Sequence, residues 1–326
     1  MKIQNKIDLH LHIDGSARPE TVYELAKKYN IEPECNMTLE EVKASMEIPE
    51  GEYDPDFLTF NPPLRAMQNE EGLTRITREL VERLEAEGLI YAELRFAPQY
   101  HCEQGMTQEE AVLAAIKGLN QGLTTCKTLK AGLILCTMNH CDPAENREAN
   151  LETVHLAKKY LGKGVYAMDM AGYEEQMENF AELFELAKKL DIPATTHSEF
   201  TVGEALKYGT KRIGHGYQAA LLPELTEQVI ERGVTLEMCP DSSLSYEYGL
   251  TGDETHPLYV LYQKGARVTV NTDNLTVLNT DLEKEYELCR KMGFTDEDIV
   301  KMNNYAIEAS FADEETKKKL LTVQPV

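Results

Sequence analysis

Two histidines separated by one residue end the first apolar run of the sequence. His10 and His12 alternate with aliphatic residues, so a β-strand would point both imidazoles to one side and the aliphatic side chains to the other. Paired imidazoles suit a divalent transition metal, but a barrel interior can also hold such a pair by hydrogen bonds. The pair therefore indicates a metal site only if further ligands lie nearby.

Further candidates follow three later apolar runs. His197, His215 and Asp273 each stand at or just after the end of an expected strand. In a parallel barrel the carboxyl ends of all strands meet at one face, so these side chains would converge with His10 and His12. Sequence positions that are far apart would then form one site.

The converging side chains suit a hydrolytic metal site. Three imidazoles (His10, His12 and His197) and the Asp273 carboxylate match the ligands of Zn²⁺ or a similar divalent ion, which lowers the pKa of a bound water to roughly 7. His215, in a turn between two glycines, would orient the attacking oxygen and stabilise developing charge. A purely structural role for His215 is the alternative.

The elements that must position these residues are read from the hydrophobic pattern. Short β-branched or apolar runs alternate with longer amphipathic stretches, which is typical of βα units around a parallel sheet. The expected strands are Lys6 to His12, Leu89 to Ala97, Ala131 to Met138, Val165 to Ala171, Pro193 to Glu199, Arg212 to His215, Val234 to Met238 and Arg267 to Thr272. Eight such units predict an α/β fold, a (β/α)8 TIM barrel.

The segments outside the regular units are also mostly helical. After the first strand we expect a long helical insertion, with a helix beginning at Pro19, a second near Leu39 to Met46, and a loop from Gly51 to Pro63. Extra helices at Asp281 to Cys289 and Asp296 to Ala309 end the chain. Without a repeat or linker, residues 1–326 are expected to form a single domain.

Composition limits the partners. The 326 residues carry a formal net charge of −23, which would repel nucleic acid and anionic membranes. The seven cysteines contain no Cys-x-x-Cys and predict a reducing compartment. No signal peptide or long apolar run is visible. We expect a cytoplasmic monomer that acts on a small neutral or cationic molecule.

The motifs together resemble the adenosine deaminase family of the amidohydrolase superfamily, nearly end to end. They are DLHLHIDGS (8–16), YAELRFAP (91–98), DMAG (169–172), RIGHG (212–216), CP (239–240), HPL (256–258), TD (272–273) and ASF (309–311). The resemblance implies a TIM barrel and zinc-dependent hydrolytic deamination of a purine nucleoside, adenosine or 2′-deoxyadenosine, to the inosine product and ammonia. The His/Glu and Cys-x-x-Cys signature of the zinc deaminases that act on cytosine, or on adenine in polynucleotides, is absent.

By this resemblance, each site residue has an expected role. The zinc ligands would be His10, His12, His197 and Asp273, with His215 beside the attacking oxygen. The substrate contacts would be His12, Asp14, Gly172 and Asn274, of which Asp14 meets a ribose hydroxyl and Gly172 meets the purine through its backbone.

The sequence departs from the family where the general acid is expected. The family has His-Ala-Gly-Glu after strand five, whereas this chain has His197, Ser198, Glu199 and Phe200. If the strand continues, Glu199 shares a face with His197 and is our candidate acid. Glu204, in the first turn of the next helix, is the alternative. Loss of the acid, typically worth about 100-fold to 10,000-fold, would leave a silent protein that binds metal and purine.

A second departure concerns base recognition. Asn274 stands where the family has an aspartate that engages the purine N7, and an asparagine amide can donate a hydrogen bond without a change of pKa. The change is compatible with purine binding but also with adenine, an N6-substituted adenosine or an aminofutalosine-like substrate. Elsewhere, we expect Glu93 and Arg95 to form a buried ion pair, and Phe57 and Phe60 to pack as a lid over the site.

Overall fold

The computed structural model describes residues 3–49, 52, 54–140, 142–174, 176–245 and 256–323. Within these ranges eight parallel strands form two four-stranded sheets, with the orders β1-β2-β3-β4 and β5-β6-β7-β8. The strands are β1 Lys6–His12, β2 Leu89–Phe96, β3 Lys130–Asn139, β4 Val165–Gly172, β5 His197–Ser198, β6 Arg212–His215, β7 Thr235–Met238 and β8 Arg267–Val270.

Single parallel bridges connect the two sheets at both seams. Leu11 pairs with Asp273, and Met168 pairs with Ala194. Two backbone hydrogen bonds support each bridge, including His12 N–H to Asp273 O (2.8 Å) and Met168 N–H to Pro193 O (3.0 Å). The eight strands thus follow one another around a ring, as the sequence predicted, and the carboxyl ends of β1, β5 and β8 are brought together.

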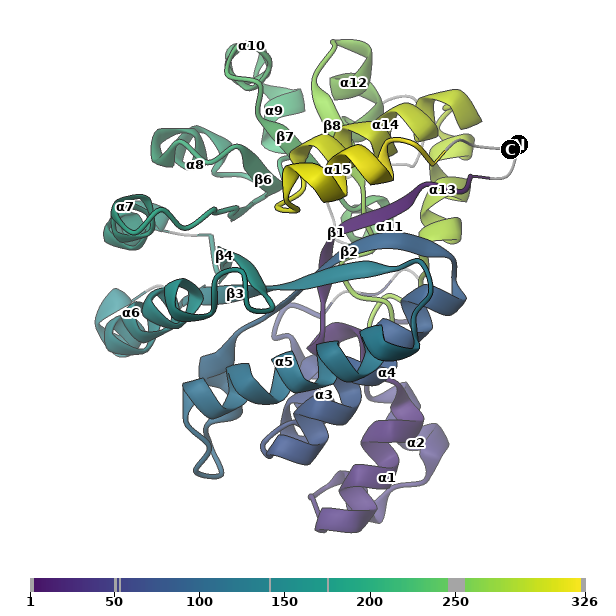
Figure 1. Ribbon diagram of the computed structural model, residues 1–326, viewed down its shortest axis with the longest axis vertical. Coiled ribbons are helices and arrows are strands. Elements are labelled where there is room, and N and C mark those ends of the chain that lie inside the picture. The colour runs from purple at the N-terminus through teal and green to yellow at the C-terminus, as the bar shows by residue number, and fades with distance from the viewer. Residues whose placement is uncertain are drawn as a thin grey trace.

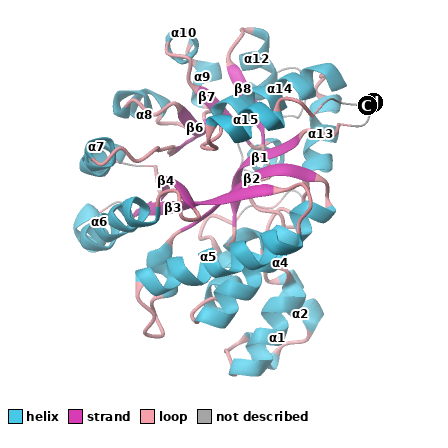
Figure 2. Cartoon of the chain, in the orientation of Figure 1, coloured by secondary structure: helices cyan, strands magenta, loops and turns pink. Residues whose placement is uncertain are grey.

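Helices surround the strands (Figures 1 and 2). They are α1 Pro19–Tyr29, α2 Leu39–Ala44, α3 Asn61–Ala66, α4 Glu70–Ala86, α5 Gln108–Thr125, α6 Pro143–Tyr160, α7 Ala181–Lys189, α8 Val202–Tyr208, α9 Gln218–Leu221, α10 Pro223–Glu231, α11 Pro240–Ser245, α12 Pro257–Gln263, α13 Leu282–Lys291, α14 Asp296–Ala309 and α15 Glu314–Leu320. In the described part of the chain, no helix is both long enough and apolar enough to span a membrane.

Local sequence signals set several helix boundaries. Pro19 occupies the first turn of α1, and Thr38 and Glu41 form a reciprocal capping box at the start of α2. The expected loop from Gly51 to Pro63 is partly wrong, because η3 (Leu58–Phe60) and the start of α3 fall inside it. Gly51 and Tyr53 lie outside the described residues. The helices expected at the end of the chain are confirmed as α13 and α14.

The fifth strand is much shorter than predicted. The sequence suggested Pro193 to Glu199, but β5 contains only His197 and Ser198, after an isolated bridge at Ala194. Pro193 has no N–H to donate, and this segment bonds in turn to β4 and to β6, since Thr195 N–H donates to Met168 O and Gly214 N–H to Thr196 O. Glu199 therefore lies in a bend beyond the strand.

Candidate functional site

The first strand presents its two imidazoles as its alternation predicts. Leu9, Leu11 and Ile13 are buried on the opposite side of β1, whereas His10 and His12 face the barrel axis near the carboxyl ends of the strands. Gly214 on β6 makes room for this arrangement, because a Cβ at that position would lie 2.8 Å from Cε1 of His10. Because Gly214 has no side chain, the His10 imidazole can extend to the centre of the barrel.

His197 and Asp273 complete a compact cluster with the histidine pair. Nε2 of His197 lies 3.1 Å from Nε2 of both His10 and His12. Oδ1 of Asp273 lies 3.5 Å from His10 Nε2 and 3.4 Å from His12 Nε2. Ser242, on the α11 segment, donates a hydrogen bond to the other oxygen of Asp273 at 2.8 Å. The four side chains expected to be ligands converge.

Glu237 on β7 fixes the far side of the His10 ring. Its Oε2 lies 3.0 Å from His10 Nδ1 and accepts a hydrogen bond from Arg95 at 2.8 Å, while Oε1 accepts one from Arg212 at 2.6 Å. Burial opposes the charge, but Arg212 and Arg95 hold the pKa of the Glu237 carboxyl well below its usual range. His10 must then donate from Nδ1, which leaves the lone pair of Nε2 directed into the cluster.

Asp169 on β4 supports His197 in a similar way. Its Oδ2 lies 2.9 Å from His197 Nδ1, in an ion-pair contact outside good hydrogen-bond alignment, and 2.7 Å from Arg95. Burial opposes the charged form of His197, but Asp169 outweighs it and raises the pKa of that imidazole. The expected ion pair between Glu93 and Arg95 is wrong, because Glu93 pairs with Arg212 instead. Glu93 and Arg95 share a face of β2, as side chains two residues apart do, but each pairs with a residue of another strand across the barrel.

His215 stands beside the cluster in a defined tautomer. The hydroxyl of Tyr217 donates to the Cys239 carbonyl at 2.9 Å and lies 3.3 Å from His215 Nδ1, so it accepts from that nitrogen. Burial, and then the charge of His197, lower the pKa of His215 well below its usual value. A neutral ring with a free lone pair on Nε2 can take a proton.

The bend after β5 brings Glu199 to this ring. Its Oε1 lies 3.9 Å from His215 Nε2, and its side chain is 16% exposed. The strand does not continue to Glu199, so the direction predicted from a shared strand face does not apply, yet the carboxylate does face His215. Glu204 does not, because it forms an exposed ion pair with Lys207 on α8. Of the two candidate acids, Glu199 is the one that lies beside His215, and its role as the acid stays a prediction.

The expected substrate contacts surround the cluster. Asp14, in η1 (Asp14–Ser16), lies 3.9 Å from His12 Nδ1, and burial raises the pKa of its carboxyl to about 6. Gly172 ends β4 with a φ of 95°, a conformation that favours glycine. Asn274 is buried against Gly15, and its Oδ1 accepts no hydrogen bond within the described part of the chain.

Aromatic residues of the insertion approach the loop after β4. The Phe57 ring centroid lies 6.1 Å from that of Phe60 and 6.3 Å from that of Tyr173, the residue that follows Gly172. The insertion thus contacts the same loop that carries the expected base-binding backbone. The lid role predicted for Phe57 and Phe60 stays a prediction.

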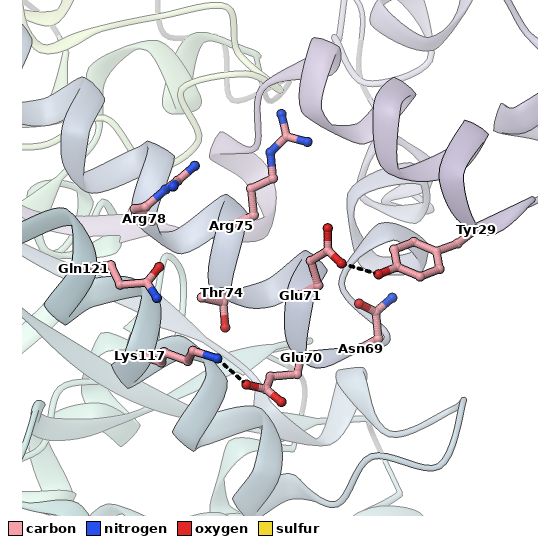
Figure 3. A pocket seen from close by; sticks show the side chains of 9 residues that line it. All are labelled: Tyr29, Asn69, Glu70, Glu71, Thr74, Arg75, Arg78, Lys117 and Gln121. Atoms are coloured by element: carbon pink, nitrogen blue, oxygen red, sulfur yellow. Dashed lines mark hydrogen bonds and ion pairs between the residues drawn. The ribbon is translucent and has the colours of Figure 1, made fainter.

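A hollow of about 620 Å³ lies elsewhere, at α4 and α5 (Figure 3). Charged residues that line it are paired, Lys117 with Glu70 inside the hollow and Arg75 with Glu24 and Glu79 outside its lining. It contains none of the predicted site residues.

Sequence reasoning missed the residues that hold the cluster in place, namely Asp169, Arg212, Glu237, Tyr217 and Ser242. A signal for three of them was present. Asp169 and Glu237 lie inside strands of mostly apolar residues, Arg212 begins β6, and charged side chains are rarely buried unless they are paired. Their partners come from other strands, so the pairing could not be read from the sequence.

Fold and cluster together define a class: an α/β barrel enzyme with a candidate metal site at the carboxyl ends of its strands. The family model for adenosine deaminase matches residues 5–323. An adenosine deaminase of Haemophilus ducreyi is 38% identical over 330 residues, which cover 97% of this chain and 94% of that protein. The chain therefore belongs to the adenosine deaminase family of aminohydrolases.

Solved structures agree with this assignment. The N6-mAMP deaminase of Arabidopsis is 26% identical, with a TM-score of 0.85 over 98% of this chain and 96% of that chain. The adenine deaminase of Arthrobacter aurescens is 22% identical, with a TM-score of 0.84 over 98% and 97%. The second likeness concerns the fold alone.

Proposed function

We propose that the protein catalyses hydrolytic deamination of a purine nucleoside, adenosine or 2′-deoxyadenosine, with a divalent metal ion, Zn²⁺ by preference. One observation carries the proposal: three imidazole nitrogens and the Asp273 carboxylate converge beside His215 and Glu199. Likeness to adenosine deaminases over nearly the full length supports the same reaction.

The donor set fits such an ion. Nε2 of His197 lies 3.1 Å from two other Nε2 atoms, and a single proton there could serve only one of them. Burial lowers the pKa of His10 and His12 well below the usual value, so each ring is neutral with a single N–H, which His10 uses at Nδ1 toward Glu237. A cation bound by His10, His12, His197 and Asp273 would satisfy all four groups.

When bound, the ion would supply an activated water molecule as the nucleophile. His215 would accept a proton from the attacking oxygen at Nε2, because its Nδ1 already donates to Tyr217. Glu199 would donate a proton to the ring nitrogen next to the attacked carbon, and the proton taken up by His215 would pass to the amino group, which leaves as ammonia. The remaining hydroxyl proton would return to Glu199 as the carbonyl forms. Asp14 would accept a sugar hydroxyl, while the Gly172 N–H and the Asn274 amide would contact the base.

A nucleotide substrate is the second candidate, given the similarity to an N6-mAMP deaminase. The segments that follow β2 to β8, up to the next helix, contain no Lys or Arg. They contribute carboxylates instead, including Glu174, Glu199 and Asp273. Recognition of a phosphate normally uses cationic side chains, so the electrostatics favour a nucleoside.

Ammonia release from the zinc-loaded protein tests the proposal. The substrates to compare are adenosine, 2′-deoxyadenosine, adenine, N6-methyladenosine and AMP. We expect turnover of adenosine or 2′-deoxyadenosine, with kcat/KM for AMP at least about 100-fold lower because the segments after β2 to β8 offer its phosphate carboxylates and no Lys or Arg. Turnover confined to AMP, adenine or N6-methyladenosine would replace the proposed substrate. Bound zinc and adenosine without turnover of any aminopurine would identify a silent binding protein.

A further inference from the structure

Glu174, on the loop after β4, contacts the segment that carries Glu199. Its Oε1 accepts a hydrogen bond from the Glu199 N–H. Its Oε2 accepts from the Phe200 N–H and from the Thr201 hydroxyl, both at 2.9 Å. One carboxylate therefore binds three successive residues of the bend between β5 and α8.

Backbone groups bind the carbonyls of this bend, but side-chain oxygens of Glu174 bind its Glu199 and Phe200 N–H groups. The ladder between β5 and β6 ends at the pair Ser198 and His215. Beyond it, the Glu199 carbonyl accepts a hydrogen bond from Gln218 N–H at 2.8 Å, whereas its N–H is directed at Glu174. The direction of the Glu199 backbone, and hence the reach of its side chain, depends on a contact from another loop.

The loop that carries Glu174 is itself held in place. Tyr173 N–H donates to Asn139 O at 3.1 Å, at the end of β3. Gly172 allows this close approach, since a Cβ there would lie 2.5 Å from Asn139 O. The loop that carries Glu174 is therefore attached to the ends of β3 and β4, and Glu174 attaches the 199–201 bend to this loop.

We propose that Glu174 is a positioning residue for the proton donor, which it acts on by fixing the 199–201 bend so that the Glu199 carboxylate faces His215. The inference rests on the proposed function, in which Glu199 supplies the proton. Hydrogen bonds to a charged acceptor are about twice as strong as neutral ones, so a carboxylate suits this task better than an amide.

Glu174→Gln tests the role with little change of shape. A glutamine has one acceptor oxygen, and its NH₂ group would face an N–H or a hydroxyl. We expect kcat to fall by roughly 10-fold to 100-fold, with KM and bound metal changed by less than about threefold. Glu174→Asp, which keeps the charge, should recover part of the loss. The matched control is Glu178→Gln, an exposed residue of the same loop, and it should behave as wild type.

A double variant separates positioning from general destabilisation. In the Glu199→Gln background, Glu174→Gln should cause no further loss of kcat, because the group it positions is already absent. If Glu174→Gln lowers kcat by the same factor in the Glu199→Gln background as in wild type, the proposal is wrong. It is also wrong if the wild-type protein is active and Glu174→Gln leaves kcat unchanged.

Hydrogen exchange gives a readout that does not depend on turnover. The peptide containing the Glu199 and Phe200 amides should exchange at least about 10-fold faster in Glu174→Gln than in wild type or Glu178→Gln. Unchanged exchange would show that Glu174 does not hold the bend. If wild type deaminates nothing, the proposed function fails, while this measurement still decides whether Glu174 fixes the bend.

Discussion

The two halves of the barrel are built differently. Strands β1 to β4 have 7 to 10 residues, whereas β5 to β8 have 2 to 4. The short half nevertheless supplies most of the site, including His197, Glu199, His215, Asp273 and Asn274. In the long half, continuous backbone ladders hold the strands together. In the short half, the positions of the strands and of the residues that follow them depend more on side-chain hydrogen bonds and ion pairs.

Buried ion pairs occur in both halves, since Arg95 on β2 pairs with Asp169 on β4 and Arg212 on β6 pairs with Glu237 on β7. In the short half they stand beside strained backbone, and Glu174 of the preceding loop secures the bend after β5. His215 and Asp273 have φ values of 61° and 59°, a conformation that costs a non-glycine residue roughly 1 to 2 kcal/mol. Because strain persists only where the surroundings enforce it, the side-chain network is what orients the reactive groups.

The largest effect is expected from the long half, at His12. His12→Ala should lose bound metal and at least about 1,000-fold in kcat/KM, because one of four ligands disappears. The fold should persist, since the ring is partly exposed and only one side chain is shortened. Elemental analysis measures the bound metal, circular dichroism the fold, and ammonia release the activity. The control is His155→Ala, because His155 is an exposed residue of α6. One metal ion per chain in His12→Ala would show that the cluster is assigned wrongly.

In the short half, Glu199→Gln should separate chemistry from metal binding. We expect kcat to fall roughly 100-fold to 10,000-fold while the metal stays bound, because the amide cannot donate the acid proton. Steady-state kinetics with metal analysis measure this. Glu204→Gln is the matched control and should retain wild-type kcat, since Glu204 pairs with Lys207 at the surface. If the two variants exchanged these results, Glu204 would be the acid.

The same contrast explains what could be predicted from the sequence. The bounds of β1 and β6 are confirmed to the residue, because apolar alternation in β1 and the Arg-Ile-Gly-His run in β6 are local signals. His10, His12, His197 and Asp273 were placed together by topology alone. The length of β5 and the partner of Arg95 were not predictable, since both depend on hydrogen bonds between residues far apart in the chain. Glu174 left no local pattern.

Removing a buried charge should cost more stability than removing an exposed one. Arg212→Met removes the guanidinium that pairs with the buried carboxylates of Glu93 and Glu237; Glu237 keeps Arg95, but Glu93 loses its ion pair, which should lower the free energy of unfolding by about 3 to 5 kcal/mol. Arg147→Met, which breaks an exposed pair with Glu182, should change it little. Urea unfolding of the metal-free proteins compares them. Equal stability of the two variants would mean that the short half does not rely on its buried charges.

The smallest effect is expected in the long half, from the titration of His101, and its pKa shift fixes the direction in which stability changes with pH. His101 follows β2 in η4 (Pro98–His101) and lies against Phe96, and burial lowers its pKa from the usual 6.5 to about 4. Below pH 6.5 the unfolded chain binds a proton that the folded chain refuses until about pH 4. This residue therefore lowers stability as the pH falls through that window, by about 3 kcal/mol in total.

His101→Leu removes the titration but keeps an apolar side chain of similar size. Other groups titrate equally in both proteins, so the variant should gain about 3 kcal/mol relative to wild type between pH 7 and pH 4. Urea unfolding at several pH values measures the difference. A constant difference would mean that His101 has the same pKa in the folded and unfolded states. The folded interior of the long half would then accept the charge of this imidazole.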